Sequence, residues 1–276
     1  MTRETTSKKV GWSILAIFTG LIFLAPLYIA FINSFKTQKG IYDNVIGLPS
    51  EGTFTLNNYL QAFKDLDFLH SFMNSLLITV VSTVIIVIFA SMAAWMLVRS
   101  KTKISKFLFF LFAGAMLIPF QSVMLPLINL MGKLHLLNPV GLVFMYLGFG
   151  SSLSIIMYHG FIKNIPVELE EAATIDGCNK FQIFWLIVFP LLKPITVTIS
   201  ILNAMWIWND FLLPQLVINR PKWHTLPLKM FYFFGQYSKQ WNLALAGLVL
   251  GMIPIIIFYL FAQKHIVKGV TQGSIK

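Results

Sequence analysis

The sequence predicts an all-α polytopic membrane protein with six transmembrane helices, and its composition is the first reason. Hydrophobic residues make up 57% of the 276 residues, whereas charged residues make up only 11%. Soluble domains average about 25% charged residues, so this chain has too little charge to cover the surface of a soluble protein. The mean hydropathy of +0.76 points the same way. A lipid bilayer is therefore the expected solvent for most of the chain.

The second reason is the presence of six apolar segments, each long enough to cross a bilayer, which takes about 20 mostly apolar residues. Backbone groups in hydrocarbon must satisfy their hydrogen bonds internally, and the segments lack the alternation of a membrane barrel. Each segment is therefore expected to be helical, within a single transmembrane domain over residues 1–276. The segments are residues 12–33, 75–98, 107–130, 138–160, 184–213 and 243–263.

The individual segments carry their own signals. Residues 12–33 end before Lys36, and a signal peptide would have a shorter apolar core and a small-residue cleavage site. We therefore expect a retained first helix. Residues 78–98 and 107–132 contain no charged residue. The last segment contains Pro254, which a membrane helix tolerates as a kink.

The orientation of the helices follows from the placement of Lys and Arg, which favour the cytoplasmic side. With a cytoplasmic N-terminus, 13 of the 21 basic residues fall on the inside, and the bias is strongest in the short loop 99–106. Both termini are then cytoplasmic, and residues 36–70 and 214–242 form the longer external segments. The net charge of +11 thus reflects membrane topology, and no nucleic-acid partner is expected.

The motifs of an autonomous pump or enzyme are missing from the sequence. It has no GxxxxGK[ST] loop for nucleotide phosphates, its five histidines are scattered, and Cys178 is its only cysteine. No catalytic residue and no metal site are therefore predicted. The spans also hold too few ionisable groups for a chain of proton carriers. If this protein moves a solute uphill, we expect the energy to come from another subunit.

The segment between the fourth and fifth spans concentrates the acidic residues. ELEEAATIDG (168–177) holds four of the ten acidic residues of the chain. Pro166 suits the first position of a helix and Asn164 is a possible cap, while acidic residues suit a first turn. Gly177 is expected to end this helix, and a second helix is expected to begin near Asn179. The segment therefore predicts a helical elbow outside the bilayer.

Local physics leaves two interpretations of this elbow open. One is a well-capped connecting helix with a solvated acidic face. The other is a docking surface, on which Ala172 and Ala173 allow close approach of a partner and Glu171 pairs with a partner's arginine or backbone N–H groups. In that case Gly177 lets the chain turn sharply, so that a push on the helix moves the next span.

A resemblance to a known family favours the second interpretation. EAATIDGCNKFQIFWLIVFP (171–190) resembles the EAA loop of ABC importer permeases, EAA-x3-G-x9-I-x-L-P. Six of the seven defined positions match, and the exception is Phe189, where the family usually has Leu. The resemblance covers nearly the whole chain and is closest to the second, smaller permease of carbohydrate importers of the maltose-transporter family. The other segments that look like that family are INSFKT (32–37), FMNSLLIT (72–79), IPFQSVMLPL (118–127), WNDFLLP (208–214) and KGVTQGSIK (268–276).

This resemblance implies a non-enzymatic permease subunit with the type I ABC importer fold, whose EAA loop (about 164–190) docks on a separate ATPase. ATP and Mg would be bound by that ATPase, so no cofactor is expected in this chain. The implied partners are a second homologous permease, two ATPase copies, an extracellular solute-binding protein, a carbohydrate and membrane lipid, in a bacterial cell membrane. The residues implied in ATPase coupling are Glu170, Glu171, Ala172, Ala173, Asp176, Gly177, Ile187 and Pro190.

Three further features each have two interpretations. Asn209 and Asp210, near the outer end of the fifth span, form either an interfacial cap flanked by tryptophans or part of the sugar path. Pro190 and Pro194 mark either an ordinary helix break or a hinge. The external segment 220–242 either rests on the membrane or contacts the binding protein, because aromatic rings suit both interfaces and sugars. Its candidate contact residues are Trp223, Phe231, Tyr232 and Trp241.

The composition is also compatible with a different class of function. A stand-alone secondary carrier or an integral membrane enzyme would share the apolar composition. Such a protein would work after purification without an ATPase, whereas a permease subunit would be inert alone.

Overall fold

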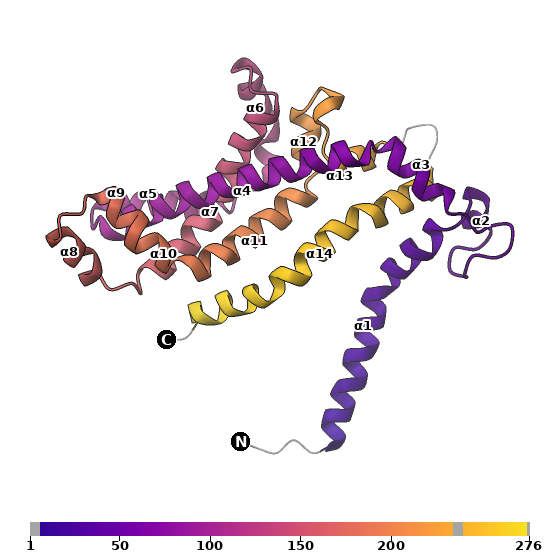
Figure 1. Cartoon of the computed structure of the whole chain (residues 1–276), viewed down its shortest axis with the longest axis horizontal. Coiled ribbons are helices and arrows are strands. Elements are labelled where there is room, and N and C mark those ends of the chain that lie inside the picture. Colours follow the sequence, from indigo (N-terminus) through magenta and orange to yellow (C-terminus); the bar gives the residue numbers. More distant parts are fainter. Residues whose placement is uncertain (1–5, 234–239, 275–276) are drawn as a thin grey trace. The chain divides into compact units, whose positions relative to one another are not determined.

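The computed structural model describes residues 6–233 and 240–274, with side chains for residues 11–233 and 240–263. Within these ranges the chain is helical, apart from connecting segments and one isolated β-bridge between Lys36 and Phe54. Figure 1 shows the helices. In chain order they are α1 (Thr6–Ser34), α2 (Gln38–Asp43), α3 (Asn57–Asp65), α4 (Phe68–Arg99), α5 (Lys103–Ala115), α6 (Phe120–Lys133), α7 (Pro139–Ile162), α8 (Glu168–Ile175), α9 (Lys180–Gln182), the π-helical turn η1 (Ile183–Val188), α10 (Phe189–Leu191), α11 (Lys193–Asn209), α12 (Leu212–Val217), the 3-10 turn η2 (Pro221–Trp223), α13 (Leu226–Phe231) and α14 (Trp241–Ser274).

Four of the described helices are long and apolar enough to cross a membrane by themselves: α1, α4, α7 and α14. Two further candidates are bent. α5 and α6 meet at 105°, and the Lys180–Leu191 segment meets α11 at 79°. The described residues therefore contain up to six spans if each bent pair counts as one.

The third expected span, 107–130, is divided by the first of these bends. Pro119 has an extended backbone (ψ 141°) and precedes the first residue of α6. A proline also disfavours the helical conformation in the residue before it, here Ile118, so α5 cannot run straight into α6. The absence of charge over residues 107–132 indicates an apolar environment, but it does not show this change of direction.

The fifth expected span, 184–213, also differs from one straight helix. Pro194 lies in the first turn of α11, and its ring cannot follow a helical carbonyl four residues earlier. The helix axis changes direction at Leu192, and α11 ends at Asn209. The short helix α12 follows, so the end of the expected span is a turn.

The sequence predicts a single domain. In the structure, the contacts between residues divide the chain into two compact units. The first comprises the chain up to Phe68 and residues Lys229–Pro254. Its centre is polar, because Asn58 Nδ2 donates to the carbonyls of Ser34 (2.9 Å) and Lys36 (2.8 Å). The buried Lys36 ammonium donates to the carbonyls of Asn44 (2.7 Å) and Gly47 (2.6 Å). These bonds fix the segment that follows α1.

The second unit comprises Leu69–Leu228 and the chain from Ile255 onward. In this unit α7 packs against α5, α11 and α12. Gly150 allows the close approach of α7 and α11, because a Cβ there would lie 2.7 Å from Asn203 Oδ1. Two apolar clusters fill the unit: one joins α4, α7, α8, η1 and α11, and the other joins α4, α6, α7, α11 and α12.

Candidate functional site: the elbow between α7 and α11

The first arm of the elbow, α8, ends as the sequence predicts. Gly177 has a φ of +86°, a conformation that favours glycine. Its N–H donates to the Thr174 carbonyl (3.1 Å), and the Cys178 N–H donates to the Ala173 carbonyl (3.0 Å). This pair of bonds is a Schellman motif, which satisfies the last carbonyls of a helix. The glycine stop is therefore confirmed.

The start of α8 differs from the expected capping. The helix begins at Glu168 after Val167, without a side-chain cap. Asn164 instead donates its amide back to the Gly160 carbonyl of α7 (3.4 Å), and Pro166 precedes the helix by two residues. The prediction of Asn164 as cap and Pro166 as first helical residue was wrong, because Asn164 continues the last turn of α7.

The second arm begins at Asn179, as expected. Asn179 Oδ1 accepts from the Gln182 N–H (3.0 Å), and Gln182 Oε1 accepts from the Asn179 N–H (2.8 Å). This reciprocal capping box fixes the start of the helix. The arm then passes through the π-helical turn η1, and π-helical turns often occur at functional sites. Ile187 is half-buried in this turn, and Pro190 is exposed in α10.

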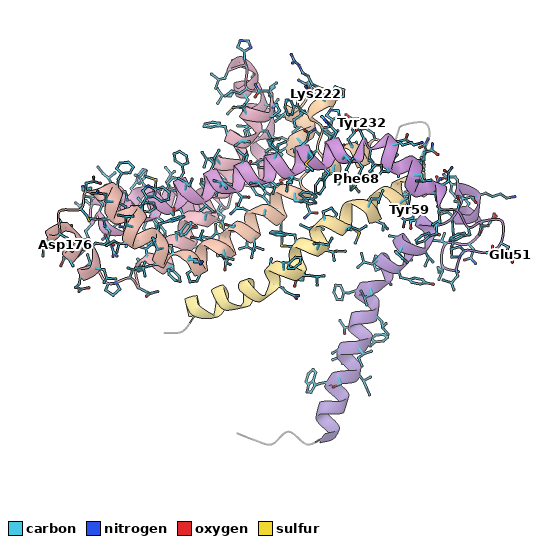
Figure 2. The ribbon with its side chains drawn as sticks, in the orientation of Figure 1. Glu51, Tyr59, Phe68, Asp176, Lys222 and Tyr232 are labelled. Carbon is cyan, nitrogen blue, oxygen red and sulfur yellow. The ribbon has the colours of Figure 1, made fainter. Side chains whose placement is uncertain are left out.

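The residues that the resemblance implies in ATPase coupling differ in exposure along α8 and just after it. Glu170 and Ala173 are buried and point toward the other helices of the second unit. Glu171, Ala172, Asp176 and Gly177 are exposed, and Figure 2 shows Asp176 at the tip of the unit. The acidic stretch is therefore not uniformly solvated: one glutamate is an internal residue, while its neighbour in sequence is open to a partner.

Glu170 is buried because α4 supplies its partners. Its carboxylate accepts from Trp95 Nε1 (3.0 Å) and from Arg99 Nε (2.9 Å), and Arg99 Nη2 lies 2.7 Å from Oε1. The Arg99 guanidinium also donates to the Ile165 carbonyl (3.0 Å). The sequence interpretation missed Trp95 and Arg99. The available signal was an arginine at the end of a charge-free apolar run.

A cavity of about 790 Å³ opens beside this ion pair, between α8 and the end of α4. Basic and acidic side chains both line it, so neither sign of charge dominates. The basic residues are Arg99, Lys101, Lys163 and Lys180, and the acidic residues are Glu168, Glu170 and Glu171.

Asn209 and Asp210 lie far from the elbow, at the other end of α11. Asp210 Oδ2 accepts from the hydroxyl of Tyr146 in α7 (3.0 Å), and Oδ1 accepts from the Leu212 N–H (3.0 Å). The amide of the exposed Asn209 donates to the Met205 carbonyl of its own helix (2.7 Å). Asp210 thus joins α11 to α7 and begins α12, and Tyr146 is the partner that sequence reasoning missed.

The aromatic residues of the external segment fall into different units. Trp223 belongs to the second unit, where it is half-buried and packs against the cluster of α6, α7 and α12. Lys222 lies over its ring, 5.7 Å from the centroid, and Figure 2 labels Lys222 well away from Asp176. Phe231 and Tyr232 are exposed and Trp241 is half-buried, all in the first unit.

Known proteins resemble this chain over most of its length. Residues 86–272 match the family described as binding-protein-dependent transport system inner membrane component. A probable starch degradation products transport system permease protein of Thermoanaerobacterium thermosulfurigenes is 49% identical over 274 residues, 99% of each chain. A multiple sugar-binding transport system permease protein of Streptococcus mutans is 37% identical, over 93% of each chain. A melibiose/raffinose/stachyose import permease protein of Bacillus subtilis is 34% identical, over 96% of this chain and 95% of the relative.

Solved structures extend the likeness to the fold. A chain of a bacterial ABC transporter involved in import of the acidic polysaccharide alginate superposes with a TM-score of 0.76 and 24% identity, over 96% of this chain and 99% of the other. A second chain, from a bacterial alginate ABC transporter in complex with an alginate pentasaccharide-bound periplasmic protein, gives a TM-score of 0.63 and 16% identity, over 95% and 96%.

Proposed function

Since the chain belongs to the family of binding-protein-dependent transport system inner membrane components, and is a multi-pass permease with the type I ABC importer fold, we propose that it forms half of the path through which an ATP-driven importer takes up a sugar or oligosaccharide. Relatives named for starch degradation products, for multiple sugars and for raffinose-type sugars support a carbohydrate cargo. The alternatives of a stand-alone carrier and a membrane enzyme find no comparable support.

The energy for this transport is supplied by a separate ATPase, which holds the ATP and Mg and docks on the exposed face of α8. The observation that carries this proposal is the division of α8, where Glu171 and Ala172 remain exposed while Glu170 and Ala173 are buried. The small side chain of Ala172 allows close approach, and the Glu171 carboxylate is available for a charge-assisted hydrogen bond. Closure of the ATPase pair then moves α8 and, across Gly177 and η1, α11.

The remaining partners follow from the same assembly. A second, homologous permease supplies the other half of the path, and two ATPase copies serve the two permeases. The exposed apolar side chains of α1, such as Phe18 and Phe23, suit contact with lipid or with that second permease. An extracellular solute-binding protein delivers the sugar to the outer segments, and both termini face the cytoplasm of a bacterial cell.

The docking surface is tested by the substitution Glu171→Lys in cells that depend on this permease for uptake. The charge reversal is expected to abolish uptake of labelled oligosaccharides and to prevent co-purification of the ATPase, while the amount of permease in the membrane stays unchanged. Glu51→Lys makes the same change at an exposed position of the segment expected outside, and it should bind the ATPase normally. Normal uptake by Glu171→Lys would contradict the docking surface.

A further inference from the structure

A buried ion pair joins α8, the helix on which we propose that the ATPase docks, to the end of α4. Glu170 is only 8% exposed, although it lies in the most acidic stretch of the chain and next to the exposed Glu171. Two donors from one turn of α4, Trp95 Nε1 and the Arg99 guanidinium, hold its carboxylate. Hydrogen bonds with at least one charged partner are short, and they are about twice as strong as hydrogen bonds between neutral groups.

The same two α4 residues also contact the segments on either side of α8. Arg99 donates to the Ile165 carbonyl, in the connection from α7 to α8. The Trp95 ring lies 5.5 Å, centroid to centroid, from the Phe184 ring of η1. The last turn of α4 is therefore bonded to α8 and packed against the segments before and after it. We call the set Trp95, Arg99 and Glu170 the clasp.

The surroundings of α8 leave it room to tilt, so its position depends on the clasp. At its C-terminal end α8 is connected to the next arm through Gly177, a single residue with a positive φ. On one side lies the cavity of about 790 Å³ between α8 and α4, and both Arg99 and Glu170 line it. Without the clasp, a force on the exposed face could tilt α8 into this space instead of moving the helices to which it is attached.

We propose that Glu170 is a positioning residue: with Arg99 and Trp95 it fixes α8 to α4, so that a force applied to α8 moves α4 and α11 together. This inference rests on the proposed docking of an ATPase on α8. It adds a second path for that force, through side chains rather than along the backbone, and it assigns neighbouring glutamates different tasks. Glu171 would contact the partner, whereas Glu170 would transmit the movement.

The test follows the distance between α8 and α4 in the assembled complex of both permeases and the ATPase. Spin labels are placed at Leu169→Cys in α8 and Phe89→Cys in α4, both exposed, with Cys178→Ser to remove the native thiol. Electron paramagnetic resonance then gives the distance distribution with ADP and with a non-hydrolysable ATP analogue. The variants are Glu170→Gln, Arg99→Gln, the double variant and Trp95→Phe, with Glu51→Gln as the control.

With the clasp intact, one distance is expected in both nucleotide states, because α8 and α4 move together. Removal of one partner of a charged hydrogen bond shifts an equilibrium by about tenfold or more. Glu170→Gln is therefore expected to add a second distance that appears only with the ATP analogue, and Trp95→Phe to do so more weakly. The Arg99→Gln/Glu170→Gln double variant should disturb the distance less than Arg99→Gln alone, which leaves a buried carboxylate without its cation.

Two outcomes overturn the proposal. One is a distance that changes with nucleotide in the wild type, and the other is a Glu170→Gln variant that keeps a single distance in both states. Failure of the ATPase-docking proposal has a different signature, because Glu171→Lys would then still co-purify with the ATPase. A variant that does not fold would lose the ADP-state distance as well. If Glu170→Gln does not fold, Trp95→Phe, which keeps an aromatic ring, is the deciding variant, and a single distance in both nucleotide states would then overturn the proposal.

Discussion

At the scale of single residues, neighbours in sequence have different surroundings because of the direction in which a helix points them. Glu170 and Glu171 have the same chemistry, yet one is bonded to Arg99 and the other is exposed. Successive residues of a helix are about 100° apart, so neighbouring side chains face different surroundings. The acidic stretch therefore combines an internal structural bond with an external surface.

Gly177 gives a residue-scale prediction. At its φ of +86°, residues with a Cβ are disfavoured by about 1–2 kcal/mol, and Asn tolerates the conformation better than other residues. A Cβ at this position would meet no atom within 4 Å, so only the backbone conformation is at stake. We expect Gly177→Val to abolish uptake and Gly177→Asn to retain most of it, as measured by labelled-sugar uptake at equal membrane levels. Equal uptake by both variants would contradict this account.

At the scale of elements, α11 is attached to α7 near both of its ends. Near its start, Tyr158 of α7 donates to Thr196 (2.9 Å), and beyond its end Tyr146 of α7 donates to Asp210 (3.0 Å). Between them, Asn203 donates to Ser154 of α7 (3.1 Å). These polar bonds, set in an apolar environment, explain why α11 stays packed on α7 despite the bend at Leu192.

The outer bond gives an element-scale prediction. Tyr146→Phe removes the hydroxyl that donates to Asp210, which costs about 1–3 kcal/mol when a buried partner loses its bond. We expect a lower midpoint of thermal unfolding in detergent and looser attachment of α12, seen as faster amide exchange in Leu212–Val217. Tyr259→Phe, which removes a hydroxyl from an exposed position of α14, serves as the control. Unchanged exchange in Tyr146→Phe would show that the bond does not fix α12.

At the scale of the whole molecule, the proposed mechanism requires the elbow and the 36–70 segment to face opposite sides of the membrane. In a Cys178→Ser background, Glu51→Cys should react with a membrane-impermeant maleimide on intact cells. Lys103→Cys, at the start of α5, should react only after the membrane is permeabilised. Both positions are exposed in the subunit. Labelling of Lys103→Cys from outside would reverse the orientation and leave the docking helix without access to a cytoplasmic ATPase.

The membrane class and the turns within the elbow were predictable from residues that are close together in the sequence. Apolar length indicates the helices, and Gly177 and Asn179 mark the stop and the start within the elbow, because the bonds at both positions involve nearby residues only. The start of α8 did not follow from local capping signals, because Asn164 is bonded to α7. The EAA-like motif lies within residues 86–272, which match the family.

Features that depend on residues distant in sequence became apparent only in the folded chain. Glu170 points inward because Trp95 and Arg99, more than 70 residues earlier, supply donors. Asp210 is hydrogen-bonded to Tyr146 of another helix. The chain bends by 105° between α5 and α6, next to Pro119, and composition does not predict this bend. The length of an apolar segment indicates that a helix is shielded from water, but which neighbour meets each side chain is set by packing between helices.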